Sequence, residues 1–139
     1  MGLDGGPIIV LASGQNTPYR ITIDQRYVYW TNFGQTTNDG SVNKVEIAGG
    51  TVTTLATGQN TPNGIAVDQN NVYWANSGGS IANGSINKIS VASGPIITLA
   101  SDQDYPSAIA IDANSIYWVN TAMHGKGDQG TVNKLVKNP

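Results

Sequence analysis

The chain has 139 residues, a formal net charge of −2 and only 12% charged residues. Its seven basic residues are scattered, so no nucleic-acid partner is predicted, because such a surface needs clustered Lys and Arg. No apolar run approaches the roughly 20 residues of a membrane helix, and the first residues lack the basic and apolar segments of a signal peptide. We therefore expect a soluble protein with no membrane partner. Cysteine is absent, which excludes disulfides and thiolate chemistry.

The composition and the local patterns predict an all-β fold. Gly accounts for 17 residues, and Asn, Thr, Val and Ile are common, a mixture that favours strands and tight turns over helices. The unit with the clearest pattern has β-type runs at 63–68, 72–77, 84–91 and 95–100. Asp, Asn and Gly at the breaks supply the turns. The first run is apolar at nearly every position, which is typical of a strand buried on both faces.

The same pattern occurs three times, in repeats 7–50, 51–94 and 95–139. Each repeat keeps an Asp, a Tyr-Trp pair and an Asn in one register, with tryptophans 44 residues apart: Asp24, Tyr29, Trp30 and Asn32; Asp68, Tyr73, Trp74 and Asn76; Asp112, Tyr117, Trp118 and Asn120. Four short strands in a repeat of about 40–45 residues are the signature of a β-propeller blade. The chain therefore reads as three consecutive blades.

The segments "VYWTN", "VYWAN" and "IYWVN" resemble the YWTD repeat of the low-density-lipoprotein-receptor type six-bladed propellers. The run "PNGIAVD" before the second of them is similar to the repeats of NHL-type propellers. The resemblance covers the whole chain and implies half of a six-bladed ring; relatives of this kind are often secreted or on the cell surface. The fourth motif position is Asn here, where the receptor family has Asp, which argues against transferring the receptors' ligand binding.

Three blades do not close a ring, because propellers have about four to eight. Residues 8–12 read as a fourth strand without the preceding three, and residues 107–137 read as three strands without a fourth. We therefore predict that the single half-propeller domain, 1–139, forms a homodimeric six-bladed ring by strand exchange, in which strand 8–12 completes the last blade of a partner chain. A nine-bladed trimer and a heteromer with another three-blade chain stay open.

The recurring side chains are predicted to serve the fold. The Tyr-Trp pairs lie in mid-strand, where buried aromatic packing is expected. Asp24, Asp68 and Asp112 precede turns, where an Asp bonds the local backbone. The Asn-Lys pairs, such as Asn43 and Lys44, are expected to expose the Lys and to pair the Asn with the backbone. No metal, cofactor or catalytic residue is predicted, and His124 lies in an inserted loop without a nucleophile.

A binding site, if present, is expected at the mouth of the central channel, since sites favour loops held by a rigid scaffold. The first strand of each blade is innermost, so its beginning should lie at that mouth. The candidates are Tyr19, Arg20, Asn63, Tyr105 and Ser107. In a dimer Arg20 occurs twice, which suits a small polar ligand or an anion.

Two functions follow from these observations. The first is a non-enzymatic, self-assembling scaffold or interaction module, an excised or designed half-propeller. The alternative is a ligand-binding propeller, for a glycan or a peptide, with its site on the channel-mouth face. An enzyme of the lactonase type is disfavoured, because such sites gather carboxylates or His in the channel and the inner strands here begin with Tyr, Asn and Ser.

Overall fold

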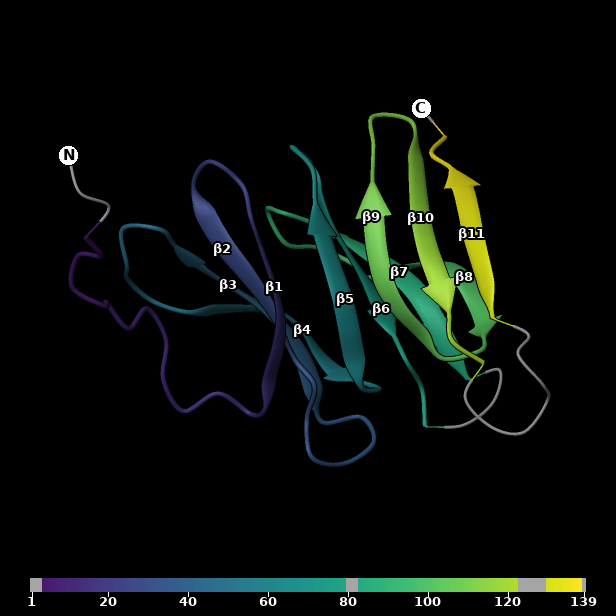
Figure 1. Cartoon of the computed structure of the whole chain (residues 1–139), viewed down its shortest axis with the longest axis horizontal. Helices are drawn as coiled ribbons and strands as arrows, with labels where there is room; N and C mark the ends of the chain where they lie inside the picture. Colours follow the sequence, from purple (N-terminus) through teal and green to yellow (C-terminus); the bar gives the residue numbers. More distant parts are fainter. Residues whose placement is uncertain (1–3, 80–82, 123–129, 139) are drawn as a thin grey trace.

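The structure, a computed structural model, describes residues 4–79, 83–122 and 130–138. Within these ranges every regular element is a β-strand, and the strands form three antiparallel sheets (Figure 1). The first sheet contains, in spatial order, β1 (Pro18–Ile23), β2 (Tyr27–Asn32), β3 (Gly40–Glu46) and β4 (Thr53–Gln59). The second contains β5 (Pro62–Val67), β6 (Asn71–Asn76), β7 (Gly84–Ser90) and β8 (Ile97–Gln103). The third contains β9 (Pro106–Ile111), β10 (Ser115–Asn120) and β11 (Thr131–Val136). The all-β prediction is confirmed.

The last strand of a full sheet is longer than the sequence pattern predicted. The predicted run ended at residue 100, whereas β8 continues to Gln103. An irregularity in the β7–β8 ladder, between the pairs Ile86–Ala100 and Gly84–Gln103, keeps the strand paired beyond that point. Asp102, within this irregularity, has φ +56°. The strand therefore carries Gln103 to the edge of the next sheet.

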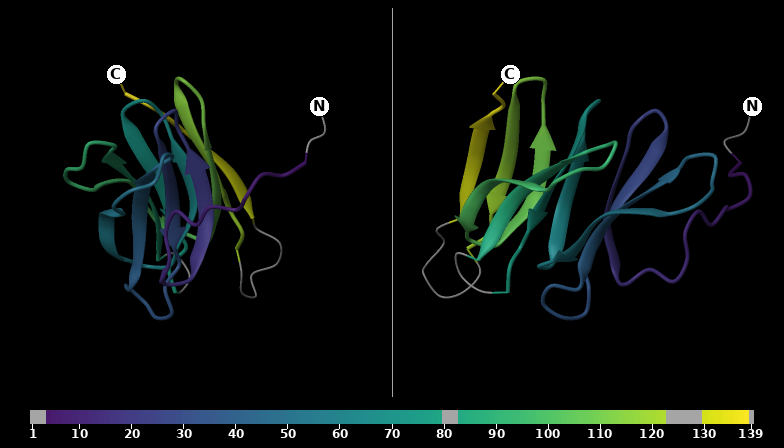
Figure 2. Two further views of the ribbon diagram at one scale, coloured as in Figure 1. Left: turned by 90° about the vertical axis from the view of Figure 1, so that its left-hand side faces the viewer. Right: turned by 180° about the vertical axis from the view of Figure 1, so that it is seen from behind.

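The three sheets lie side by side, and the inner strand β5 lies between the inner strands β1 and β9 (Figure 2). The N-terminal segment lies beyond the first sheet, and β11 forms the opposite end of the molecule (Figure 1). In the part of the chain that the structure describes, there is no helix with the length and apolar character needed to cross a bilayer. The arrangement leaves one uncovered face at each end of the row of sheets.

Neighbouring sheets share a hydrophobic core, which we call the inter-sheet core. Between the first and second sheets it contains Tyr29, Val42, Leu55 and Ala56 from one side and Ile65, Val72, Trp74 and Ile89 from the other. Between the second and third sheets the corresponding residues are Tyr73, Ile86, Leu99 and Ala100, and Ile109, Ile116, Trp118 and Leu135. The Tyr of each Tyr-Trp pair thus faces the next sheet and the Trp faces the preceding one.

Burial of the inner strands depends on whether a sheet covers each face. Ile65 in β5 is 8% exposed, whereas Ile21, at the same repeat position in β1, is 70% exposed because no sheet precedes it. The third sheet covers the opposite face of β5. A Cβ at Gly64, on that face, would lie 2.6 Å from the backbone carbonyl oxygen of Ser107 in β9. The two-sided burial expected of the first run therefore holds for β5, which has neighbours on both sides.

The Asn-Lys pairs differ from their predicted role. Asn43 is buried, and its amide bonds the side chains of Ser41 (2.9 Å) and Thr54 (2.9 Å) on its own sheet rather than the backbone. Lys44 is half-buried, and its Nζ donates to the carbonyl oxygen of Val91 in the next sheet, at 2.6 Å. The expectation of an exposed Lys is wrong for Lys44, because the following sheet covers the face of β3 that bears it, whereas Lys134 is exposed as expected. Asn43 lies on the other face of β3 and finds its partners within its own sheet.

Gln59 connects two sheets by hydrogen bonds. It ends β4 of the first sheet, and its Oε1 accepts from Trp74 Nε1 and Asn76 Nδ2 of the second sheet, both at 3.0 Å. Gln103 makes the same pair of bonds to Trp118 and Asn120 of the third sheet, at 2.9 and 3.1 Å. A buried donor that loses its acceptor is costly, so this Gln holds the spacing between sheets.

We expect the Gln59→Ala variant to lose about 2–4 kcal/mol of unfolding free energy, because two buried donors lose their acceptor. Gln69→Ala is the matched control: Gln69 is exposed in a turn, and its loss should cost under about 0.5 kcal/mol. Urea unfolding monitored by tryptophan fluorescence measures both. Equal stability of the two variants would contradict the role given to Gln59.

Candidate assembly surface and channel-mouth residues

The N-terminal segment has the sequence of a strand but joins no sheet within its own chain. Residues 7–15 read PIIVLASGQ, close to PIITLASDQ at 95–103, which contains β8. Residues 4–10 form no strand and are exposed, Ile8 to 96%. The segment thus presents an apolar, unpaired backbone, as expected of a strand whose sheet is missing.

The end of this segment is already held as the end of a fourth strand. Gln15 Oε1 accepts from Trp30 Nε1 and Asn32 Nδ2 of the first sheet, both at 3.0 Å, as Gln59 does one repeat later. Gly14 and Thr17 have φ of +66° and +57°, matching +64° and +51° one repeat later. Residues 14–17 therefore have the backbone conformation and the Gln contacts of residues 58–61, which connect β4 of one sheet to β5 of the next.

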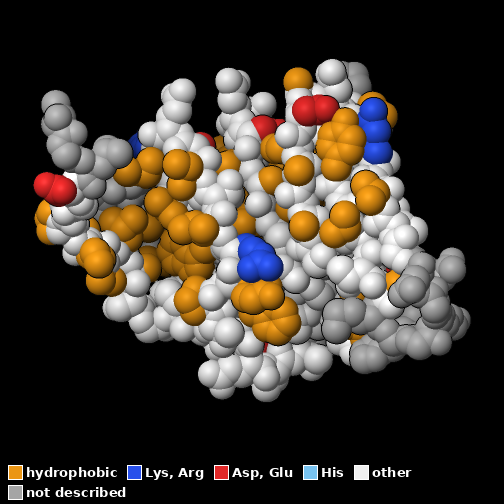
Figure 3. Space-filling view, in the orientation of Figure 1, with side chains coloured by type: hydrophobic (Ala, Val, Ile, Leu, Met, Phe, Trp, Pro, Cys, Tyr) orange, Lys and Arg blue, Asp and Glu red, His pale blue; other side chains and the backbone are white. Residues whose placement is uncertain are grey.

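A cavity of about 440 Å³ lies between this segment and the first sheet. Its lining includes Leu11, Ala12, Ile21, Val28, Trp30 and Val45. These are the repeat equivalents of six of the eight residues of the inter-sheet core. The two missing positions, those of Tyr29 and Val42, correspond to Tyr117 and Val132 of the third sheet. Figure 3 shows the hydrophobic side chains gathered on this side of the molecule.

The opposite end of the molecule carries the complementary features. Strand β11 pairs with β10 alone among the described strands, so one edge of its backbone is open. Val132 and Val136 are 83% and 61% exposed, although the matching Val42 of the first sheet is fully buried. Ala108 and Ala110 of β9 are exposed on the same face. This end therefore has the repeat equivalents of Tyr29 and Val42 together with a strand edge that is unpaired among the described residues.

The repeated Asp residues have one structural arrangement. Asp68 Oδ1 accepts from the backbone N–H groups of Asn70 (2.9 Å) and Asn71 (2.8 Å), and Oδ2 accepts from the Tyr73 hydroxyl (2.9 Å). Asp24 and Asp112 make the equivalent bonds. No group of three His, Cys, Asp or Glu side chains that could hold a metal occurs in residues 4–79, 83–122 and 130–138. The carboxylates thus close turns and fix the tyrosines.

These contacts move the pKa values of both partners. Burial acts to raise the pKa of Asp68, but the bonds from Asn70, Lys137, Asn71 and Tyr73 outweigh it and hold this pKa below its usual value. The pKa of Tyr73 rises to about 12, through burial and then through its bond to Asp68. Lys137 Nζ lies 3.0 Å from Asp68 Oδ2 and so adds an ion pair between the second and third sheets.

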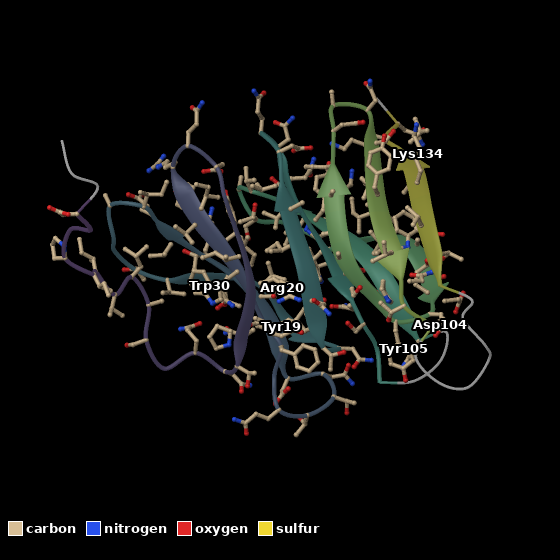
Figure 4. All side chains as sticks on the ribbon, in the orientation of Figure 1. Tyr19, Arg20, Trp30, Asp104, Tyr105 and Lys134 are labelled. Atoms are coloured by element: carbon tan, nitrogen blue, oxygen red, sulfur yellow. The ribbon has the colours of Figure 1, made fainter. Side chains whose placement is uncertain are left out.

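The candidate channel-mouth residues differ in their surroundings. Tyr19 is 46% exposed, its ring lies 5.3 Å from that of Phe33, and the Arg20 guanidinium lies 4.2 Å from the centre of the Tyr19 ring. Figure 4 shows Tyr19 and Arg20 together, apart from Tyr105. Phe33 is not among the residues predicted for this site; its signal in the sequence is an aromatic residue at a position that holds Ser77 and Thr121 in the other repeats.

The remaining candidates are less available to a ligand. Asn63 is buried. Its side-chain Nδ2 donates to Ser77 Oγ (3.3 Å), and its backbone carbonyl oxygen accepts from Thr31 Oγ1 of the first sheet (3.0 Å). Ser107 and Tyr105 are half-buried, and the Tyr105 carbonyl oxygen accepts from the hydroxyl of Thr121. His124 lies outside the described residues. The structure therefore brings together Tyr19 and Arg20 with Phe33, and not all five candidates.

Comparison with known proteins supports the fold. No protein-family model matches the chain, and no curated protein matches it either. A chain in the crystal structure of a nidogen/laminin complex is similar with a TM-score of 0.62 and 20% identity; the match covers 80% of this chain and 43% of that one. The crystal structure of the computationally designed Ika4 protein is similar with a TM-score of 0.54 and 15% identity, over 96% of this chain and 99% of that one. The chain has a β-propeller-like fold, and at these identities the likeness extends to the fold alone.

Stability is expected to fall in acid because of the three turn carboxylates. The pKa values of Asp24, Asp68 and Asp112 are lowered by folding, so the unfolded chain binds protons first as the pH falls. Their contribution is complete above the unfolded value of 3.8 and is lost as the pH falls through the folded values. Urea unfolding between pH 6 and pH 2 measures this dependence. A triple Asp→Asn variant with the same acid dependence as the parent would contradict this origin.

Proposed function

We propose that the chain is a non-enzymatic, self-assembling β-propeller scaffold, two copies of which close a six-bladed ring. The proposal rests on one observation: the equivalents of the eight inter-sheet core residues are divided between the two ends of the chain. Six of these eight positions surround the cavity at the N-terminal end, and the residues for the other two, Tyr117 and Val132, lie on the third sheet, with Val132 exposed. Burial of apolar surface of this kind is the main driving force for association.

In the proposed ring, the third sheet of one copy packs on the first sheet of its partner. Residues 8–12 then pair with the open edge of β11 and complete that sheet, an addition of a strand to a free edge. The repeat also predicts a polar contact across this seam. Lys44 donates to the carbonyl of Val91 in the next sheet, so Lys134 is expected to donate to the carbonyl of Ile47 in the other copy.

Two identical seams are expected, since the N-terminal end of each copy meets the β11 end of the other. Such a head-to-tail interface forms a closed ring when the rotation between copies is right. Two chains give six blades, within the usual range of about four to eight. A nine-bladed trimer and a heteromer with a different three-blade chain use the same seam and differ in mass.

A ligand-binding role at the channel mouth is the second candidate function. The exposed Tyr19 and Arg20, with the half-buried Phe33 beside Tyr19, favour it. A glycan or a peptide would be held by loops and strand ends that the ring keeps rigid.

We expect a solution mass of twice 14.5 kDa by light scattering on a sizing column. Val132→Asp should reduce it to that of a single chain, because a carboxylate in the completed core would be buried without a partner, whereas the free chain exposes this position. Thr57→Asp, on an exposed part of β4, is the control and should keep the parent mass. A folded single chain from the parent sequence would overturn the proposal, and a mass of three chains would replace the dimer with a trimer.

A cross-link tests the seam directly. In the intact sheets, Asn43 and Asn87 pair with Thr54 and Thr98, at side-chain contacts of 2.9 Å. The same register pairs Asn133 with Val10 of the other copy, close enough for a disulfide.

Since the chain has no cysteine, the Val10→Cys, Asn133→Cys variant should oxidise to a covalent dimer, resolved by non-reducing electrophoresis. The Val10→Cys, Thr57→Cys variant should cross-link poorly. A ladder of long polymers in place of the dimer would mean an open chain of copies and would contradict ring closure.

A further inference from the structure

The two arginines of the chain have different environments. Arg26 forms an ion pair with Glu46, with 2.9 Å between Nη2 and Oε1. Arg20 has no acidic partner and no side-chain hydrogen bond among the described residues, and its guanidinium lies over the Tyr19 ring. The contact with the ring fixes the guanidinium and leaves its N–H donors available to a ligand.

The fold does not require this group of side chains. Tyr19, Arg20 and Phe33 correspond to Asn63, Gly64 and Ser77 in the second repeat, and to Ser107, Ala108 and Thr121 in the third. The other two sheets thus form with small or polar residues at all three positions. The departure from the repeat gathers one cation and two aromatic rings at a single place.

The cluster is accessible in the free chain, where Tyr19 and Arg20 are exposed. Both residues also line the N-terminal cavity, at which the proposed seam forms. The ligand site therefore borders the seam, and its test includes the solution mass of each variant, so that a change in assembly is told apart from a change in the site.

We propose that Arg20, Tyr19 and Phe33 bind a uronic-acid unit of an acidic glycan. A guanidinium presents paired donors that match a carboxylate. The exposed Tyr19 ring and the half-buried Phe33 ring offer apolar surface with a polar hydroxyl, which suits a sugar ring with its own hydroxyls. A peptide is better served by a free strand edge, and the open edge of β11 lies at the other end of the molecule (Figure 1).

Calorimetric titration of the full chain at low salt tests the ligand class with three probes: trigalacturonate, the neutral galactotriose and triglutamate. Trigalacturonate should bind one per chain, and the other two should bind at least about tenfold more weakly, because only the first offers both a carboxylate and a sugar ring. Equal binding of triglutamate would overturn the sugar assignment, and no binding of trigalacturonate would overturn the site.

Arg20→Gln should weaken trigalacturonate binding by at least about tenfold, while Arg26→Gln, the matched control, should bind like the parent. Arg20→Lys keeps the charge but loses the paired donors, and it should fall between them. Each variant should keep the parent mass in light scattering, which separates loss of the ligand site from loss of assembly. Equal affinity of the Arg20→Gln and Arg26→Gln variants would overturn the proposal.

Discussion

Each sheet in this protein has apolar side chains on both faces and so needs a neighbouring sheet on each side, and this two-sided requirement governs the rest of the structure. The Tyr-bearing face of one sheet packs against the Trp-bearing face of the next, with Leu55 and Ala56 of the outer strand completing the core. Only the second sheet satisfies the requirement on both sides. The exposed Ile21 at one end and Val132 at the other result from the absence of a further sheet.

The polar interactions follow from the same arrangement. Gln59 accepts from Trp74 and Asn76 across a sheet boundary, and Lys44 crosses the same boundary to the carbonyl of Val91. Within each repeat, by contrast, the Asp–Tyr bond of the type formed by Asp68 and Tyr73 is local and repeats without change. Local bonds therefore shape each sheet, while the Gln and Lys contacts determine how successive sheets are spaced and aligned.

Positions at which the three repeats differ distinguish the residues of the candidate site from those that the fold needs. Positions that keep their residue type, such as the Tyr-Trp pairs, serve packing that all three sheets need. Tyr19, Arg20 and Phe33 have no counterpart in the other repeats, and the sheets without them have the same strand pairing. A side chain that the fold can omit is free to be selected for binding, because a change at such a position costs little stability.

The sequence by itself determined the strands, their turns, the three repeats and the all-β class, because neighbouring strands within a sheet are consecutive in the chain and their pairing depends on local patterns. It also placed Tyr19 and Arg20 at the beginning of an inner strand. Only the tertiary structure decided the contacts between sheets: the extension of β8 to Gln103, the paired amides of Gln59 and Asn76, the approach of Phe33 to Tyr19 and the six core positions around the N-terminal cavity. These depend on the distance and angle at which one sheet meets the next, which the packing of side chains from separate repeats sets and which no local pattern encodes.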